Sequence, residues 1–287
     1  MVYLLAICAA VLFSLAAFVQ HREAQKAPAT SALKLSLLSR LVKRPIWIIG
    51  VALDLLAFVA QFLALKDGSL LLVQPILAFG LTSTLVLEAV FGARRGFGRV
   101  AALSLLSAAA LAVFLLTTNI TSTSTVPSAT WGVVIGVVVV AGFFAFKWLV
   151  AGLKGRSRGV AMGVSVGLLH GVATFVIKAA ANSVSIDGFL GSLDSWPLYA
   201  LVAVGAIDLV LTQSAFQSSP LSVTMPVITV LEPTVAMLMG VAILHEAVSS
   251  RFGGAFLATN LAAMALAALV ISVAASRLVE AAEEEVV

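Results

Sequence analysis

The chain has 287 residues, of which 61% are hydrophobic and 10% are charged, and its mean hydropathy is +1.14. Soluble domains carry about 25% charged residues, so this composition excludes a water-soluble globular protein. The single cysteine, Cys8, excludes a disulfide framework and a cysteine-ligated metal site.

Apolar segments follow one another along the chain, and each is long enough to cross a bilayer, which takes about 20 residues. In chain order we predict them at residues 2–20, 46–66, 69–91, 98–118, 131–150, 159–181, 197–217, 219–244 and 252–276. The first segment lacks the basic start and the small-residue cleavage site of a signal peptide. The predicted fold class is therefore all-α, a polytopic membrane protein with about nine transmembrane helices.

Basic residues predict the orientation of these helices. Most Lys and Arg residues fall in the loops 21–45, 92–99 and 151–158, whereas the opposite side holds only Lys66 and Arg251, with Lys178 near a helix end. Because cytoplasmic loops carry an excess of Lys and Arg, we expect an external N-terminus and a cytoplasmic C-terminus in the plasma membrane. The basic charge is thus a topology signal, and no nucleic-acid partner is expected.

A shift of 151 residues aligns parts of the two halves of the chain. It matches Ala64 to Ala215, Leu70 to Leu221 and Pro75 to Pro226, on either side of two very short turns. Because the shift equals an odd number of spans, the halves have opposite orientations, as in the inverted repeats of many secondary transporters. We predict an inverted repeat of spans 1–4 and 6–9. The chain then divides into a first half (1–118), connecting loops with span 5 (119–158), a second half (159–276) and a cytoplasmic tail (277–287).

Ionisable residues in the bilayer core are costly and mark candidate functional sites. Asp54, His170, Asp208 and Glu232 lie near the centres of spans 2, 6, 7 and 8. Buried carboxylates and histidine exchange protons in the physiological range, so these four are the predicted substrate and coupling residues. The alternative is that they pair with one another or with Lys178, or are protonated and only structural.

Other polar residues and prolines are candidates for a cavity between the helices. Prolines free backbone carbonyl groups inside a helix, and such groups must face protein or water. Gln61 and Gln74 flank a short turn and either bond each other or line a vestibule. The predicted helix-breaking residues are Pro75, Pro226 and Pro233, and the predicted pocket-lining residues are Gln61, Gln74, Lys178, Gln213, Ser222 and Thr229.

Three further features complete the expectations. The glycines at 159, 163, 167 and 171 predict a close helix–helix contact. His245 and Glu246 are expected to form a surface pair with Arg251. The motifs GxxxxGK[ST], HExxH and CxxC are absent, so neither an ATP-driven pump nor an enzyme is expected, no cofactor is implied, and the identity of any metal is left open.

The stretch from Trp47 to Pro75, with Gly50, Gln61-Phe62, Ala64 and Leu72-Val73, resembles the drug/metabolite transporter superfamily and, within it, the NIPA-type magnesium transporters. The stretch from Ala215 through Pro226 to Glu246 resembles the related EamA-type pattern. NIPA-type proteins carry an acidic residue where this chain has Phe58, and the glutamate that ends the first proline helix is replaced around Arg94-Arg95. Both differences reduce the charge available for a cation.

The resemblance implies a secondary transporter that works by alternating access. The first hypothesis is a carrier, proton-coupled or facilitative, of a small metabolite or lipid-linked group. A divalent-cation (magnesium) transporter is the second, and a membrane scaffold without a transport cycle is the third. The expected partners are a small-molecule, lipid-linked or cationic substrate, the lipid bilayer and a second copy of the chain in a homodimer.

Overall fold

A computed structural model describes residues 1–27, 35–78, 113, 116–219, 221–250 and 252–254 of the chain. Within these residues, six helices are long and apolar enough to cross a membrane: Val2–Ala24, Pro45–Asp67, Ala129–Ala151, Gly155–Asp194, Trp196–Ser218 and Val223–Leu244. They confirm six of the nine predicted spans. The predicted spans 98–118 and 252–276 lie almost wholly outside the described residues, and of 69–91 only the helical residues 70–78 are described. The chain is a mostly helical, multi-pass membrane protein.

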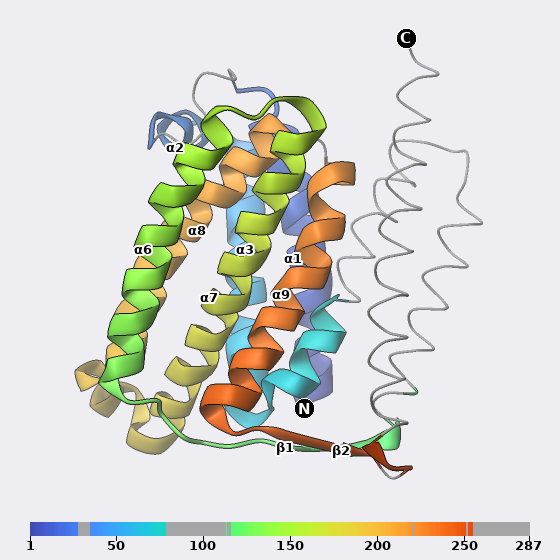
Figure 1. The fold of residues 1–287 in the computed structure, drawn as a ribbon, viewed down its shortest axis with the longest axis vertical. Helices are drawn as coiled ribbons and strands as arrows, with labels where there is room; N and C mark the ends of the chain where they lie inside the picture. The colour runs from blue at the N-terminus through green and yellow to red at the C-terminus, as the bar shows by residue number, and fades with distance from the viewer. Residues whose placement is uncertain (28–34, 79–112, 114–115, 220, 251, 255–287) are drawn as a thin grey trace.

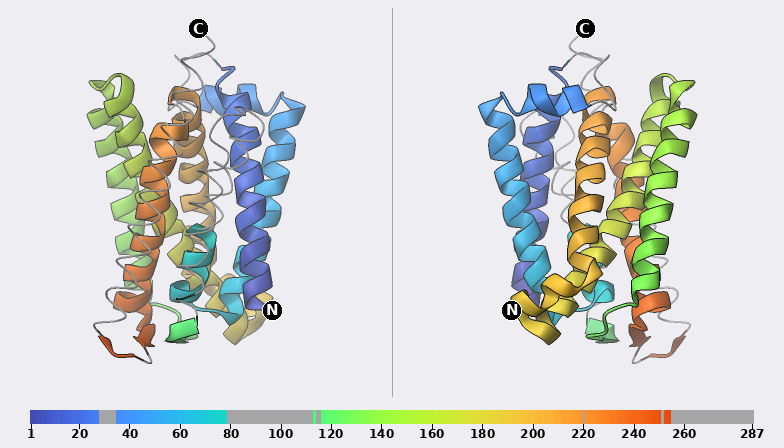
Figure 2. Two further views of the ribbon diagram at one scale, coloured as in Figure 1. Left: turned by 90° about the vertical axis from the view of Figure 1, so that its right-hand side faces the viewer. Right: turned by 90° about the vertical axis from the view of Figure 1, so that its left-hand side faces the viewer.

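The long helices stand side by side in one bundle (Figures 1 and 2). They are α1 (Val2–Ala24), α3 (Pro45–Asp67), α6 (Ala129–Ala151), α7 (Gly155–Gly191), α8 (Trp196–Ser218) and α9 (Leu221–Leu244). The short helix α2 (Leu35–Leu41) lies at one end of the bundle, here called the α2 end, and the strands β1 (Thr118–Thr121) and β2 (Ala247–Ser250) lie at the other, the sheet end. The described parts of the predicted basic loop 21–45 and the loop 151–158 lie at the α2 end.

Small residues set the distances between the closest helices. Helix α1 packs on α3 with buried alanines on both helices, including Ala6, Ala9, Ala60 and Ala64. Helix α7 packs on α9 through the four predicted glycines, where an added Cβ would lie 2.5–2.9 Å from atoms of α9. The predicted glycine contact is confirmed, and it follows from the close backbone approach that small residues allow.

The two short turns matched by the predicted repeat have the same backbone design. Helix α3 ends at an extended Gly68, whose N–H donates to Ala64 O at 2.8 Å, and α8 ends at an extended Ser219, whose N–H donates to Ala215 O at 3.1 Å. Helices α1 and α7 run in opposite directions, as do α3 and α8 (Figure 1). These features support the inverted repeat for the described helices, and the full repeat stays a prediction.

Three sequence expectations need correction. Strands β1 and β2 pair antiparallel from Thr118↔Ser250 to Thr121↔Ala247, although no strand was expected in the polar segment after residue 118. Helix α7 extends to Gly191, well beyond the predicted end at 181. The predicted helix breaks at Pro226 and Pro233 are wrong, because α9 is helical through both prolines. Within the long helices described, non-helical backbone lies at Gly188 of α7, where φ is 71°. The apolar pattern of the sequence does not show whether a helix continues beyond its membrane-crossing residues or through a proline.

Candidate functional site

A cluster of ionisable side chains occupies the middle of the bundle. His170 of α7 lies between two carboxylates, with Nδ1 3.3 Å from Glu232 Oε2 of α9 and Nε2 3.2 Å from Asp208 Oδ1 of α8. The hydroxyl group of Thr212, one turn after Asp208, lies 3.1 Å from the same Nε2. The structure therefore brings together three of the four residues predicted from depth alone.

Asp54 of α3 joins this cluster from the other half of the chain. Its carboxylate interacts electrostatically with Asp208 and His170, and the Gln20 side chain of α1 is its hydrogen-bond partner. Helices α3 and α7 are in direct contact, which places Asp54 on the side of the bundle that faces His170. All four predicted coupling residues thus form one group, drawn from α3, α7, α8 and α9.

The cluster is partly exposed and crowded with negative charge. The side chains of His170, Asp208 and Glu232 are 25%, 23% and 17% exposed, although each lies near the centre of its helix. Three carboxylates and one imidazole give a net charge of −2 when all are ionised. Unbalanced charge is costly at membrane depth, so the cluster has a physical reason to bind protons or a cationic group.

A chain of buried hydrogen bonds reaches Asp54 from the α2 end. The Trp47 indole N–H of α3 donates to Gln213 Oε1 of α8 at 2.9 Å, and Gln213 Nε2 donates to Gln20 Oε1 of α1. Trp47, Gln213 and Gln20 are 4%, 0% and 3% exposed. Gln213 was predicted as a pocket residue, but Gln20 and Thr212 were missed. Gln20 marks the end of a predicted span, where a polar residue is ordinary, so only the packing of α1 on α3 reveals it.

A second buried charged group lies at the sheet end, around the turn between α3 and helix 70–78. The ammonium group of Lys178, fully buried, donates to Leu65 O at 2.8 Å, Gly68 O at 2.7 Å and Ser122 Oγ at 3.2 Å. An ammonium group has three N–H donors, so this set satisfies it. Lys178 therefore caps the carboxyl end of α3 and does not line a pocket at mid-depth.

Glu246 secures the other side of the same turn. Its Oε2 accepts hydrogen bonds from the backbone N–H groups of Leu70 at 2.9 Å and Leu71 at 3.4 Å. Burial raises the pKa of the Glu246 carboxyl to about 7, against the opposing effects of Lys178 and the two N–H donors. The side chain is 2% exposed, so the expected surface pair with Arg251 is wrong for Glu246, and Arg251 itself lies outside the described residues.

The remaining predicted residues have mainly structural contacts. Gln61 Nε2 donates to Thr174 Oγ1 at 3.4 Å, and the buried Gln74 Nε2 has no hydrogen-bond partner among the described residues, so the alternative in which Gln61 and Gln74 bond each other is wrong. Thr229 donates to Met225 O at 2.8 Å within α9. Pro75 lies in helix 70–78, and the side chains of Ser222 and Pro226 lie outside what the structure describes.

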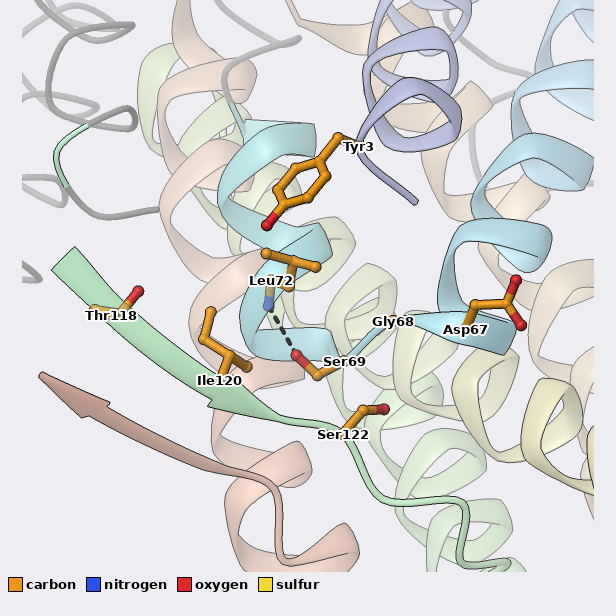
Figure 3. Close-up of a pocket in the computed structure, with 8 residues that line it drawn as sticks. All are labelled: Tyr3, Asp67, Gly68, Ser69, Leu72, Thr118, Ile120 and Ser122. Carbon is orange, nitrogen blue, oxygen red and sulfur yellow. Dashed lines mark hydrogen bonds between the residues drawn. The ribbon is translucent and has the colours of Figure 1, made fainter. Parts of the chain in front are cut away.

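A small cavity of about 160 Å³ opens at the sheet end (Figure 3). The start of α1, the turn after α3 and strand β1 surround it, and its lining residues are Tyr3, Asp67, Gly68, Ser69, Leu72, Thr118, Ile120 and Ser122. Ser122, which accepts a hydrogen bond from Lys178, forms part of its wall. The cavity therefore adjoins the capped turn and is separate from the central cluster.

Comparison with known proteins shows that the chain is similar to a bacterial protein. An uncharacterized protein of Corynebacterium glutamicum is 30% identical over 250 residues, which cover 83% of this chain and 85% of that protein. No family model matches the chain, and no solved structure matches it.

Proposed function

The chain belongs to the same family as the uncharacterized Corynebacterium glutamicum protein, and we propose that it is a secondary transporter of the drug/metabolite type. It moves a small metabolite or a lipid-linked group across the plasma membrane by alternating access, with proton exchange at the central cluster. The N-terminus is external and the C-terminus cytoplasmic, as the basic loops at the α2 end indicate.

One observation carries this proposal: His170 lies between Asp208 and Glu232 at mid-depth, with Asp54 beside them from the other half of the chain. An imidazole between two carboxylates binds a proton that either carboxylate then stabilises. Because the four groups interact, they gain and lose protons as a unit. A cationic substrate group or a proton entering the cluster offsets the same negative charge, which couples the two binding events.

The packing on either side of the cluster supports alternating access. Toward the α2 end, Gln20 and Trp47 of the first half bond Gln213 of the second half. Toward the sheet end, Gln61 bonds Thr174, and Lys178 bonds the end of α3. Each of these two sets of hydrogen bonds joins the two halves of the chain, so each is a candidate gate that opens in turn.

A divalent-cation transporter remains the second candidate because the cluster reaches a net charge of −2. The imidazole of His170 occupies the position between Asp208 and Glu232 that a cation would take. Among the described residues, no group of three or more His, Cys, Asp or Glu side chains is arranged to hold a metal ion. A scaffold without transport, the third candidate, requires a closed and fully paired centre, whereas the clustered side chains keep 17–25% of their surface accessible.

The experiment starts from a thermal-stabilisation screen of the purified full chain against metabolites, lipids, and Mg²⁺ or Mn²⁺ at pH 5.5 and 7.5. The compound that stabilises best is then labelled, and its uptake is measured in proteoliposomes with and without an imposed proton gradient. We expect Glu232→Gln and His170→Gln to abolish gradient-driven uptake, because each removes a proton site of the cluster.

Asp187→Asn is the matched control, since Asp187 is an exposed acidic residue of the same helix as His170. It should retain gradient-driven uptake. Unchanged uptake and an unchanged pH profile in both cluster variants would remove the cluster from the mechanism. Stabilisation by Mg²⁺ alone, lost in Asp54→Asn and Asp208→Asn, would replace the carrier by the cation transporter.

A further inference from the structure

The bonds between Trp47, Gln213 and Gln20 have a fixed direction. An indole N–H is a donor only, so the atom of Gln213 that faces Trp47 must be its carbonyl oxygen, Oε1. The NH₂ group of Gln213 is then turned toward Gln20, whose carbonyl oxygen accepts from it. One donor therefore determines the orientation of two amides that are otherwise free to rotate by 180°.

The last member of this chain faces Asp54. Because its carbonyl oxygen is used by Gln213, Gln20 offers its NH₂ group to the Asp54 carboxylate, with which it is hydrogen-bonded. An N–H donor favours the ionised carboxylate, whereas a carbonyl oxygen would require a protonated carboxyl group as its donor. The direction of the hydrogen bonds from Trp47 to Gln20 thus affects the ionisation state of Asp54.

The spacing of residues along α3 allows Gln20 to lie between Trp47 and Asp54. Trp47, Gly50 and Asp54 are spaced at i, i+3 and i+7, which puts them on one face of the helix. A Cβ at Gly50 would lie 2.7 Å from Gln20 Cγ and 3.4 Å from the Gln20 backbone nitrogen. Gly50 therefore makes the room in which the Gln20 side chain crosses α3 between Trp47 and Asp54.

We infer that Trp47 and Gln213 are positioning residues: acting through Gln20, they direct an N–H donor at Asp54 and so favour the ionised form of that carboxylate. The groups that face Asp54 are Gln20 from α1, His170 from α7 and Asp208 from α8, and Glu232 of α9 acts through His170. Its role in coupling rests on the proposed function. Burial and the neighbouring charge of Asp208 oppose that form, so the donor from Gln20 affects how readily Asp54 takes part in proton exchange within the cluster.

Infrared spectroscopy tests this inference without a substrate, because the C=O stretch of a protonated carboxyl group is distinct from the bands of carboxylates. The full chain in lipid is measured at pH 7, and the Asp54 contribution is the band that Asp54→Asn removes. In the wild type we expect the ionised form to predominate and this band to be weak. In Trp47→Phe, both amides are free to rotate, and the ratio of protonated to ionised Asp54 should rise about tenfold or more.

Gln213→Leu is a second variant with the same expected sign, since it also frees the carbonyl oxygen of Gln20, and it keeps the test decisive if Trp47→Phe does not fold. Trp196→Phe is the matched control, because the Trp196 indole at the start of α8 donates to Pro127 O, away from the cluster. No change in the folded variants, or an equal change in Trp196→Phe, would overturn the inference. The proposed function fails separately, through unchanged proton-driven uptake in the Glu232 and His170 variants.

Discussion

The carboxylate of Glu246 accepts a hydrogen bond from the backbone N–H of Leu70 at 2.9 Å, across 176 positions of sequence. The first N–H groups of a helix have no partner within it and form the positive end of its dipole. A carboxylate that binds two of them holds the start of helix 70–78. Together with Lys178, which binds the last carbonyl groups of α3, it fixes the turn between the two helices.

Glu246 makes part of the stability dependent on pH. The ordinary pKa of its carboxyl is 4.5, and burial raises it to about 7 in the folded protein. Between these values the folded state holds a proton that the unfolded chain has released, so the free energy of unfolding decreases as pH rises through this window. We expect the Tm of the wild type to fall relative to that of Glu246→Gln between about pH 4.5 and 7. Identical pH profiles for the two proteins would contradict this prediction, and Asp187→Asn should match the wild type.

Lys178→Met should be among the most destabilising single substitutions in the described residues. It leaves the carbonyl groups of Leu65 and Gly68 buried without their donor and removes the cation near Glu246. Each buried acceptor left without its donor costs about 1–3 kcal/mol, and we expect a loss of this size or larger by thermal unfolding in detergent. Lys66→Met removes the same charge from a half-buried position in the last turn of α3 and should cost less than about 0.5 kcal/mol.

The cost of Lys178→Met should also depend on Glu246. In Lys178→Met with Glu246→Gln, no unbalanced carboxylate remains, so the double variant should lose less stability than the two single losses added together. Strict additivity would show that the two side chains act on the turn independently.

Gly171→Ala tests the contact between α7 and α9. Its Cβ would lie 2.5 Å from Val235 Cβ and 2.9 Å from the backbone oxygen of Glu232, so the helices must separate beside the central cluster. Such overpacking costs about 1–3 kcal/mol. Gly136→Ala in α6 meets nothing within 4 Å and should be neutral or stabilising by up to about 1 kcal/mol. Equal Tm values for the two variants would contradict the close contact.

His170→Gln should destabilise the protein more than Thr212→Val does. Without the imidazole, the carboxylates of Asp208 and Glu232 lose the group that lies between them. They are then left to repel each other and Asp54. Thr212→Val removes only a hydroxyl contact of the same ring, and its effect should be smaller. A loss of Tm in His170→Gln that is no larger than the loss in Thr212→Val would argue against charge pairing at the centre.

The sequence by itself determined the membrane class, the positions of six described spans, the glycine contact and the depth of the central residues. These properties depend on how many apolar residues follow one another and on where a polar residue falls within a helix, and both can be counted along the chain. The depth of Asp54, His170, Asp208 and Glu232 was sufficient to identify them as a candidate group.

Only the tertiary structure decided which side chains meet. His170 lies between Asp208 and Glu232, Gln20 and Trp47 meet through Gln213, and Glu246 is buried against a helix start far away in sequence. The rotation of each helix about its axis sets these contacts, and in a nearly uniformly apolar helix no amphipathic pattern fixes that rotation. Small residues such as Gly50 and Gly171 fix it instead, because they allow one backbone to approach another on one face alone.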